Sequence, residues 1–240
     1  IEGTFLFYRK LLVPYKKKAL PFPNNAYNFA VRVLPDGVVI ITRSTEKRKI
    51  MKITLKDGSF KEYESAMAVI DIAKDISEGL ARVACVAEVD GKIVDLRTTV
   101  DKDCTLNILT FDSEEGKKAY RHTCAHVMAE AVKHLYPDAK LTIGPAIDNG
   151  FYYDFDMPSL TREDLDAIEK EMKKIIKKGD KLEYFTLPKD EAIKLMTERD
   201  EPYKVEMIKE HGDDETLSFY QQGDFIEFCA GPHLMSTKQI

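Results

Sequence analysis

The stretch RHTCAHVMAEAVKHLYPDAK, residues 121–140, predicts a long helix at the centre of a domain. Two histidines, His122 and His126, lie four positions apart on it, with Cys124 between them. At about 100° per residue, the large apolar side chains and Cys124 gather on one side, and both histidines fall nearly opposite. Side chains at positions i and i+4 can converge on one point, as in helices that supply two metal ligands or two catalytic groups.

A second stretch, EFCAGPHL at residues 227–234, carries another cysteine and histidine four positions apart. Gly231-Pro232 predicts a tight, rigid turn after a strand, with Cys229 and His233 on either side. Together with the two helical histidines they could form a four-ligand structural zinc site, or a catalytic site of three ligands and water. Without metal, the same set could orient a water molecule. From the residues alone, a buried cysteine and solvent-exposed histidines remain the alternative.

Further candidates are single polar side chains in NGFYYDFD, EPYKVEMI and EFCAGPHL: Tyr152, Tyr153, Asp154, Lys204 and Glu227. Each one taken alone is more often structural than functional. The lysine-rich run at 169–181 could contact RNA phosphates. Because a buried apolar stripe already explains its periodicity, we interpret it as a solvated helix face.

Composition narrows the class of protein. The net charge of −5 gives no general basic field for nucleic acid, although a small tRNA-binding patch could still exist. Four cysteines lie far apart without a CxxC pair, which fits a reducing cytosol and no disulfide framework. The apolar runs are too short to span a membrane, and no signal peptide is visible. We therefore expect a cytoplasmic protein.

The first part of the chain divides at Met51. Residues 1–50 are an unassigned extension in which we expect little stable structure, apart from a hairpin at 30–44 over a Pro-Asp-Gly turn. In residues 51–112, apolar and polar side chains alternate on either side of Asp-Gly turns at 57–58 and 90–91, which predicts hairpins. Between these hairpins we expect a helix capped by Ser65 and ended by Gly79. Two strands, a helix and further strands suit a small β-grasp domain.

Residues 113–240 predict a second α+β domain, with an antiparallel sheet beside the long central helix. Ser113 is the expected N-cap of that helix, which Pro137 stops. Thr161 should cap the next helix, which Gly179 ends; its expected buried stripe is Leu165, Ile168, Met172 and Ile175. Because the chain starts at Ile1 and ends at Ile240, we expect a piece of a longer protein, truncated near the end of this domain.

Three segments together resemble a known family. HTCAHVMAEAVKHLYPDAKLTIGPAIDNGFYYDFD, EPYKVEMI and GDFIEFCAGPHL are similar to the amino-terminal editing domain of bacterial threonyl-tRNA synthetases. MKITLKDGSFKEYESAMAVIDIAKDISEGLA resembles the TGS domain that precedes it. The resemblance covers about residues 51–240, and the joined pattern HxxxH, GFYYDFD and CxGPH is highly specific.

The resemblance implies hydrolysis of mischarged seryl-tRNA(Thr). Serine differs from threonine only by a missing methyl group, which a synthetic site discriminates weakly. The family's editing residues correspond here to the catalytic set His122, His126, Lys204, Cys229 and His233, with Tyr153 and Glu227 as substrate-binding residues. The family commonly has aspartate at the position of Glu227, so the geometry of serine recognition differs in this chain.

The resemblance also sets expectations for cofactors and partners. Editing in the family is expected to need no cofactor, with zinc held by His122, His126, Cys229 and His233 as the alternative. ATP and a further zinc belong to the synthetic core, which this chain lacks, so it should not make threonyl-tRNA. The expected partner is the tRNA(Thr) 3′ acceptor end carrying serine. Dimerisation is expected through the missing core, which leaves this piece a monomer.

Two other functions fit the same pattern. A TGS domain and an editing-like domain can precede a nucleoside kinase and serve it as a regulatory module. A free-standing trans-editing protein is a further alternative. Class II motifs after residue 240 would favour the synthetase, and a GxxxxGK[ST] motif would favour the kinase.

Overall fold

The computed structural model describes residues 29–33, 39–43, 50–213 and 215–240, and the chain divides into two units, 1–49 and 50–240. In the first unit, β1 (Phe29–Val33) and β2 (Val39–Arg43) form an antiparallel hairpin, as the sequence predicts. The predicted Pro-Asp-Gly turn lies outside the described residues, as does the rest of the extension.

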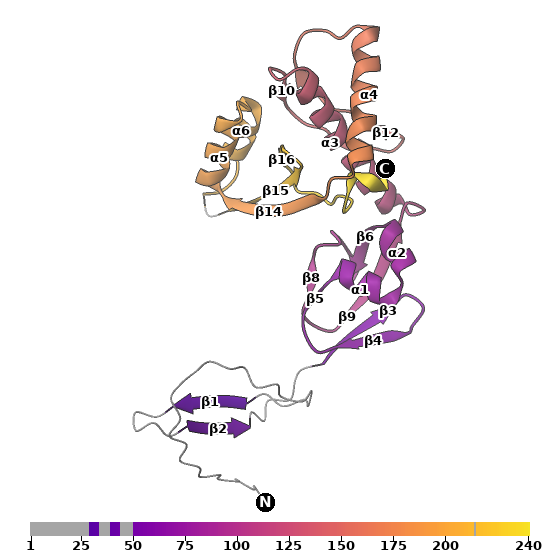
Figure 1. Ribbon diagram of the computed structural model, residues 1–240, viewed down its shortest axis with the longest axis vertical. Helices are drawn as coiled ribbons and strands as arrows, with labels where there is room; N and C mark the ends of the chain where they lie inside the picture. The colour runs from indigo at the N-terminus through magenta and orange to yellow at the C-terminus, as the bar shows by residue number, and fades with distance from the viewer. Residues whose placement is uncertain (1–28, 34–38, 44–49, 214) are drawn as a thin grey trace, which may run out of the picture. The chain divides into compact units, whose positions relative to one another are not determined.

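The second unit opens with a mixed five-stranded sheet of order β4-β3-β9-β6-β7 (Figure 1). β3 and β9 are parallel neighbours, and the other pairs in this sheet are antiparallel. A short pair, β5 and β8, lies outside it. This is the β-grasp arrangement that the sequence predicts. The strands are β3 (Met51–Leu55), β4 (Phe60–Tyr63), β5 (Met67–Ala68), β6 (Ala84–Val89), β7 (Lys92–Val94), β8 (Thr99–Val100) and β9 (Cys104–Thr110).

Both Asp-Gly hairpin turns are confirmed. Gly58, at φ 83°, lies in the connection between β3 and β4. Asp90 and Gly91, at φ 50° and 79°, turn β6 into β7. These positive φ angles suit glycine and aspartate at little cost, which is why the two dipeptides mark the turns in the sequence. One core lies under this sheet, built mainly from Met51, Ile53, Val69, Ile72, Ala84, Ala87, Leu96, Val100 and Leu106.

The boundaries predicted for the helix between Ser65 and Gly79 are wrong. Residues 67–68 are extended because they pair with β8, so α1 begins only at Val69 and runs to Ile76. Ser77 then has an extended backbone, and its hydroxyl accepts hydrogen bonds from Gly79 N and Leu80 N. It therefore caps a second helix, α2 (Glu78–Val83), and Gly79 lies inside that helix rather than after α1.

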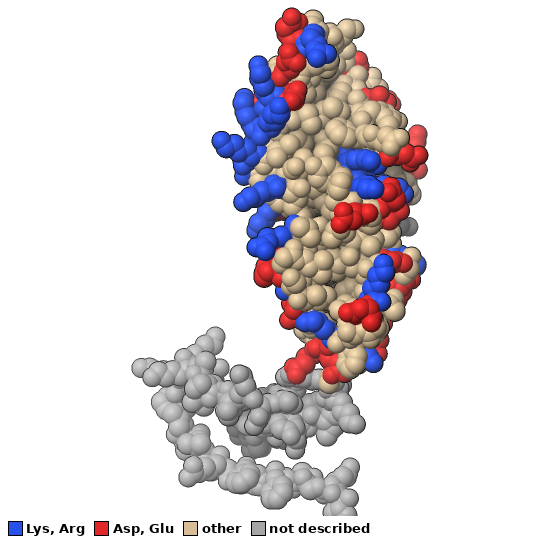
Figure 2. All heavy atoms as spheres, turned by 90° about the vertical axis from the view of Figure 1, so that its right-hand side faces the viewer, with Lys and Arg blue, Asp and Glu red and all other residues tan. Residues whose placement is uncertain are grey.

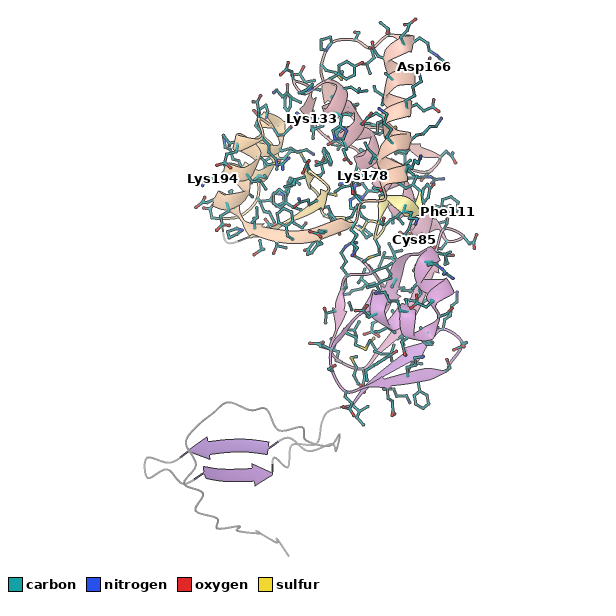
Figure 3. All side chains as sticks on the ribbon, in the orientation of Figure 1. Cys85, Phe111, Lys133, Asp166, Lys178 and Lys194 are labelled. Carbon is teal, nitrogen blue, oxygen red and sulfur yellow. The ribbon has the colours of Figure 1, made fainter. Side chains whose placement is uncertain are left out.

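Helix α3 (Glu114–Leu135) lies at the centre of the remaining structure and has the predicted N-cap, Ser113, which accepts a hydrogen bond from Gly116 N. One side packs on α4 (Arg162–Lys178), and the other meets the hairpin of β11 (Ala146–Ile147) and β12 (Gly150–Phe151). Ala125 and Ala129 on the histidine side are fully buried, so the alternative of a solvent-exposed face is wrong. Cys124 is buried as expected. In Figure 3, Lys133 marks α3, and side chains fill the space between α3 and α4.

Helix α4 (Arg162–Lys178) has the predicted ends. Thr161 and Asp164 form a reciprocal capping box, and Gly179 adopts the left-handed conformation. The expected buried stripe is wrong at Leu165, which is 49% exposed. Several lysines on the outer face pair with nearby acids, such as Lys173 with Glu169. Figure 2 shows basic side chains along one edge of the molecule, interspersed with acidic ones, as expected for a solvated face.

The last part of the chain forms the antiparallel sheet β14-β15-β16, with α5 and α6 packed together beside it. None of the helices in the described ranges is long and apolar enough to cross a membrane. The remaining elements are β10 (Lys140–Leu141), β11 (Ala146–Ile147), β12 (Gly150–Phe151), β13 (Phe155–Asp156), β14 (Leu182–Pro188), α5 (Lys189–Glu198), α6 (Pro202–Lys209), β15 (Thr216–Gln222), β16 (Phe225–Phe228) and the 3₁₀ turn η1 (Thr237–Gln239).

Two helical glycines should respond oppositely to alanine. A Cβ at Gly116 would lie 1.9 Å from the carbonyl oxygen of Thr110, whereas at Gly79 it would make ordinary contacts with Ser77 Oγ at 3.4 Å and Arg82 Nη2 at 4.0 Å. Gly116→Ala should therefore lower the free energy of unfolding by about 1–3 kcal/mol through overpacking. Gly79→Ala should raise it by about 0.5–1 kcal/mol through helix propensity. Urea unfolding of both variants measures the difference, and stabilisation by Gly116→Ala would contradict the close approach of α3 to β9.

Candidate functional site

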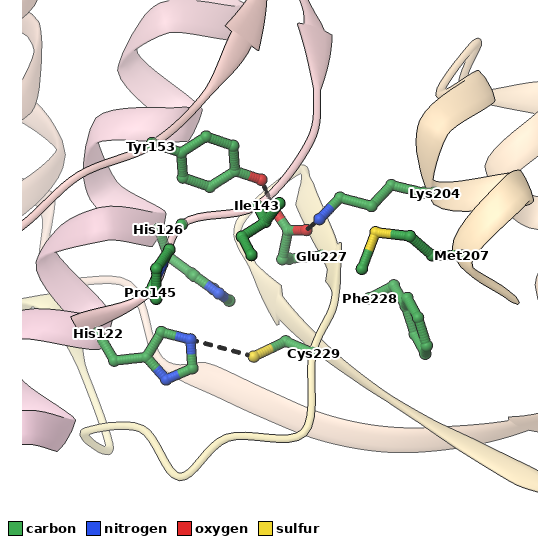
Figure 4. Close-up of a pocket in the computed structure, with 11 residues that line it drawn as sticks. His122, His126, Ile143, Pro145, Tyr153, Lys204, Met207, Glu227, Phe228 and Cys229 are labelled. Atoms are coloured by element: carbon green, nitrogen blue, oxygen red, sulfur yellow. Dashed lines mark hydrogen bonds and ion pairs between the residues drawn. The ribbon is translucent and has the colours of Figure 1, made fainter. Parts of the chain in front are cut away.

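Helix α3 and the turn after β16 bring the four predicted cluster residues together. His122 and His126 come from the helix, and Cys229 and His233 from the turn. The Sγ of Cys229 lies 3.3 Å from His122 Nε2 and 3.4 Å from His233 Nε2. One ligand atom from each of the four residues lies within 4.8 Å of the others. Figure 4 shows His122 directed toward Cys229 across the floor of a pocket.

The turn that carries Cys229 and His233 is tight, as the sequence predicts. The Gly231–Pro232 peptide is cis, and Gly231 has φ 69°. Gly231 N donates a hydrogen bond to Cys229 Sγ at 3.3 Å. A Cβ at Gly231 would lie 2.2 Å from the hydroxyl of Tyr220, so both the backbone angle and the space require glycine.

Thr123 determines which nitrogen of His233 carries the proton. The Thr123 hydroxyl donates its only hydrogen to the carbonyl of Ala119 at 2.8 Å. It accepts from Leu234 N at 3.0 Å, and His233 Nδ1 lies 3.2 Å away. Since the hydroxyl has no second hydrogen, Nδ1 of His233 must be the donor. The lone pair of Nε2 therefore faces the cluster, where it can accept a proton or bind a cation.

Burial keeps the cluster uncharged at neutral pH. Desolvation lowers the pKa of His122 to about 4. The pKa values of His126 and His233 lie well below the ordinary range for the same reason, and the neighbouring histidines lower them further. Burial also raises the pKa of the Cys229 thiol to about 12. Without a bound cation, Cys229 is therefore a thiol and a poor nucleophile.

Three other predicted residues form a chain of contacts on the opposite wall. Glu227 on β16 forms a buried ion pair with Lys204 on α6. The other carboxylate oxygen accepts a hydrogen bond from Tyr153 Oη at 2.7 Å. Burial raises the pKa of Glu227, and the Lys204 ammonium opposes that rise. The sequence offers these residues singly; the structure joins them (Figure 4).

The two groups of side chains enclose a pocket of about 180 Å³. His233 does not line it, since its ring lies behind His122 and His126, with ring centroids 4.1 and 4.0 Å away. Tyr152 and Asp154 are exposed and do not contribute to the lining. The lining residues are His122, His126, Ile143, Gly144, Pro145, Tyr153, Lys204, Met207, Glu227, Phe228 and Cys229.

Sequence reasoning missed several residues of this site. Ile143, Met207 and Phe228 supply apolar lining that no local pattern distinguishes from core. Gly144 allows Tyr153 to approach, because a Cβ there would lie 2.1 Å from its ring. Thr123 could have been predicted as part of the site, because a hydroxyl that follows His122 on a buried helix face needs hydrogen-bond partners.

The donor set also fits a zinc ion. Tetrahedral zinc with typical Zn–N and Zn–S bonds places neighbouring ligand atoms about 3.3–3.6 Å apart. The two Cys229 Sγ to histidine distances of 3.3 and 3.4 Å match that spacing. All four side chains would be ligands, which would close the coordination shell and make the site structural.

Comparisons with known families place the chain in a class. Residues 51–110 match the TGS domain. Residues 217–240 match the threonyl and alanyl tRNA synthetase second additional domain, in the segment that contains Glu227, Cys229 and His233. The chain thus combines a TGS domain with a domain found in these two synthetases.

The similarity to individual curated proteins narrows these two synthetases to one. The chain is 59% identical over 192 residues to the threonine–tRNA ligase of Acetivibrio thermocellus, and 54% over 192 residues to that of Clostridioides difficile. The Caldanaerobacter subterraneus ligase is 57% identical over 193 residues. Each match covers 80% of this chain and 30% of the relative. The chain corresponds to the amino-terminal region of bacterial threonyl-tRNA synthetases, as its sequence motifs indicate.

Replacing Thr123 should test the contact that orients His233. Thr123→Val keeps the shape but leaves Leu234 N and His233 Nδ1 without an acceptor, which should cost about 1–3 kcal/mol of unfolding free energy. Thr123→Ser keeps the hydroxyl and should retain the Nδ1–H tautomer. ¹⁵N NMR of the histidine rings reports the tautomer, and an unchanged His233 signal in Thr123→Val would contradict the assignment.

Proposed function

We propose that this chain hydrolyses the ester bond of seryl-tRNA(Thr) in the pocket between α3 and β16. The observation that carries the proposal is the convergence of two histidines with the Lys204–Glu227–Tyr153 chain around one small pocket. The curated relatives are named threonine–tRNA ligases, and the chain spans 30% of their length.

The pocket wall around Glu227 suits the amino acid. Its carboxylate can accept hydrogen bonds from the α-ammonium group of a seryl ester, with Tyr153 and Lys204 holding it in place. Ile143, Met207 and Phe228 limit the space beside it. Serine's hydroxymethyl group fits there, and the extra methyl of threonine would contact these apolar side chains. A pocket that rejects the larger amino acid complements a synthetic site that admits the smaller one.

The nucleophile in this proposal is water. Because Cys229 is a thiol and both pocket histidines are neutral, His122 or His126 can accept a proton as water attacks the ester carbonyl. The new C–O bond forms to the water oxygen, and the bond to the ribose oxygen breaks. That oxygen leaves with the proton the histidine took up, as a ribose hydroxyl. Lys204, as a nearby cation, stabilises the negative charge that develops on the carbonyl oxygen.

A deacylation assay tests the activity. The chain should release serine from seryl-tRNA(Thr) much faster than threonine from threonyl-tRNA(Thr), and His126→Ala should slow serine release by about 10²-fold or more. His134→Ala is a matched control, because His134 lies on the same helix but is exposed and outside the pocket lining. Equal loss of both amino acids, or no loss above the buffer rate, in this chain and in a complete synthetase that contains it, would overturn the proposal.

Zinc should inhibit this reaction. A bound ion would engage all four donors, including the lone pairs of His122 and His126 that the water needs. We expect a chelator to leave the rate unchanged and one equivalent of Zn²⁺ to lower it. Metal analysis of the purified chain accompanies the assay. If a chelator abolishes the reaction and stoichiometric zinc restores it, the metal-free mechanism is wrong and the reaction depends on zinc.

A further inference from the structure

A loop of the TGS domain contacts the turn that carries His233. The loop joins β7 to β8 and contains Asp95 and Arg97. Asp95 Oδ2 accepts hydrogen bonds from the backbone N of His233 at 3.2 Å and from the hydroxyl of Tyr220 at 2.9 Å. One oxygen of a TGS carboxylate therefore holds two groups of the other domain, more than 100 residues further along the chain.

Arg97 donates hydrogen bonds to backbone carbonyl oxygens of the same region. Its guanidinium donates to the backbone oxygens of Leu182 at 2.9 Å, Leu234 at 2.9 Å and His233 at 3.4 Å. It is held in place by Asp95, whose two oxygens lie 2.9 and 3.0 Å from Nη1. A planar guanidinium can bridge several carbonyls at once, and a lysine ammonium cannot reproduce that geometry.

Tyr220 transmits these contacts to the cluster. Its ring packs edge-on against the imidazole of His233, with centroids 4.5 Å apart, and its hydroxyl closes on Gly231. The His233 ring is thus held by Tyr220 behind it and His122 and His126 before it. Its backbone is held by Asp95, and Thr123 holds its Nδ1. Of these supports, Asp95 comes from the TGS domain, as does Arg97, which donates to the backbone oxygen of His233.

We propose that Asp95 and Arg97 are positioning residues for the hydrolytic site: the TGS domain holds the turn of residues 231–234 in its working geometry. The inference rests on the proposed function for its kinetic consequence, but the contact itself can be tested without substrate. A displacement of about 1 Å in such a cluster can lower the rate about 10²-fold. The TGS domain would then be a structural part of the editing site as well as its neighbour in the chain.

The test compares Asp95→Ala with Asp75→Ala in the full chain. Asp75 is a matched control, since it also accepts from a basic side chain, Lys61 Nζ at 2.7 Å, and from a tyrosine, Tyr63 Oη at 3.0 Å. Hydrogen exchange of the His233 amide should become about five- to tenfold faster in Asp95→Ala, because its acceptor is lost. Exchange there should not change in Asp75→Ala.

Kinetics supply the second readout. Single-turnover release of serine should fall about 10- to 100-fold in Asp95→Ala, with little change in the tRNA concentration giving half the maximal rate. Asp95→Asn keeps an oxygen acceptor for His233 N and Tyr220 Oη and should recover most of the rate. Arg97→Lys should slow the reaction because it releases carbonyls of the turn. The Asn and Lys variants also keep the test decisive if the alanine variant does not fold.

The outcomes separate the two proposals. If neither the unmodified chain nor a complete synthetase that contains it releases serine, the proposed function fails, and hydrogen exchange still decides whether Asp95 holds the turn. If the chain is active but Asp95→Ala leaves both the exchange of His233 and the rate unchanged, the positioning role is overturned. A slower rate with an unchanged exchange of residues 231–234 also overturns it, since the loss would not act through the turn.

Discussion

Helix α3 has to be buried along both of its long sides, and the rest of the second domain is arranged to satisfy that constraint. Its large apolar side packs against α4, around Val127, Ala131 and Val132. Its small-residue side, with Ala125 and Ala129, packs against Leu141, Tyr153 and Phe225. Because alanines leave room, β16 and its following turn can approach closely enough for Cys229 to meet His122. The pocket forms where this second layer does not quite close over the helix.

The two walls of that pocket differ in charge: one carries neutral side chains and the other an ion pair. In the cluster formed by α3 and the turn after β16, desolvation keeps three imidazoles and a thiol neutral, so no counterion is needed. On the opposite wall, Lys204 and Glu227 are both buried and form an ion pair, which opposes the rise that burial gives to the pKa of Glu227. Under the proposed function, the ammonium group of the seryl ester would use the carboxylate of that pair.

Much of the fold follows from local chemistry that the sequence displays. Ser113, Thr161 and Gly179 are caps whose side chains or backbone freedom leave few alternatives, so the two long helices are predictable. Ser65 is the expected cap, but pairing of residues 67–68 with β8 delays α1 to Val69, and Ser77 instead caps α2. The second buried side of α3 was not visible, since alanines give no apolar stripe on a helical wheel. The contacts of Asp95 had no local signal at all, because they link residues more than 100 positions apart.

Glu227 stands at a position where the family that the sequence resembles commonly has aspartate, whose side chain is one methylene group shorter. Its backbone position is fixed by the β15–β16 register, in which it lies opposite Tyr220. An aspartate there would end about one C–C bond, roughly 1.5 Å, short of the present carboxylate. It could not reach both Lys204 on α6 and Tyr153 after β12 unless one of those segments moved inward. The glutamate therefore matches the present spacing between β16 and its two partners, and the proposed selectivity for serine would depend on that spacing as well as on the carboxylate.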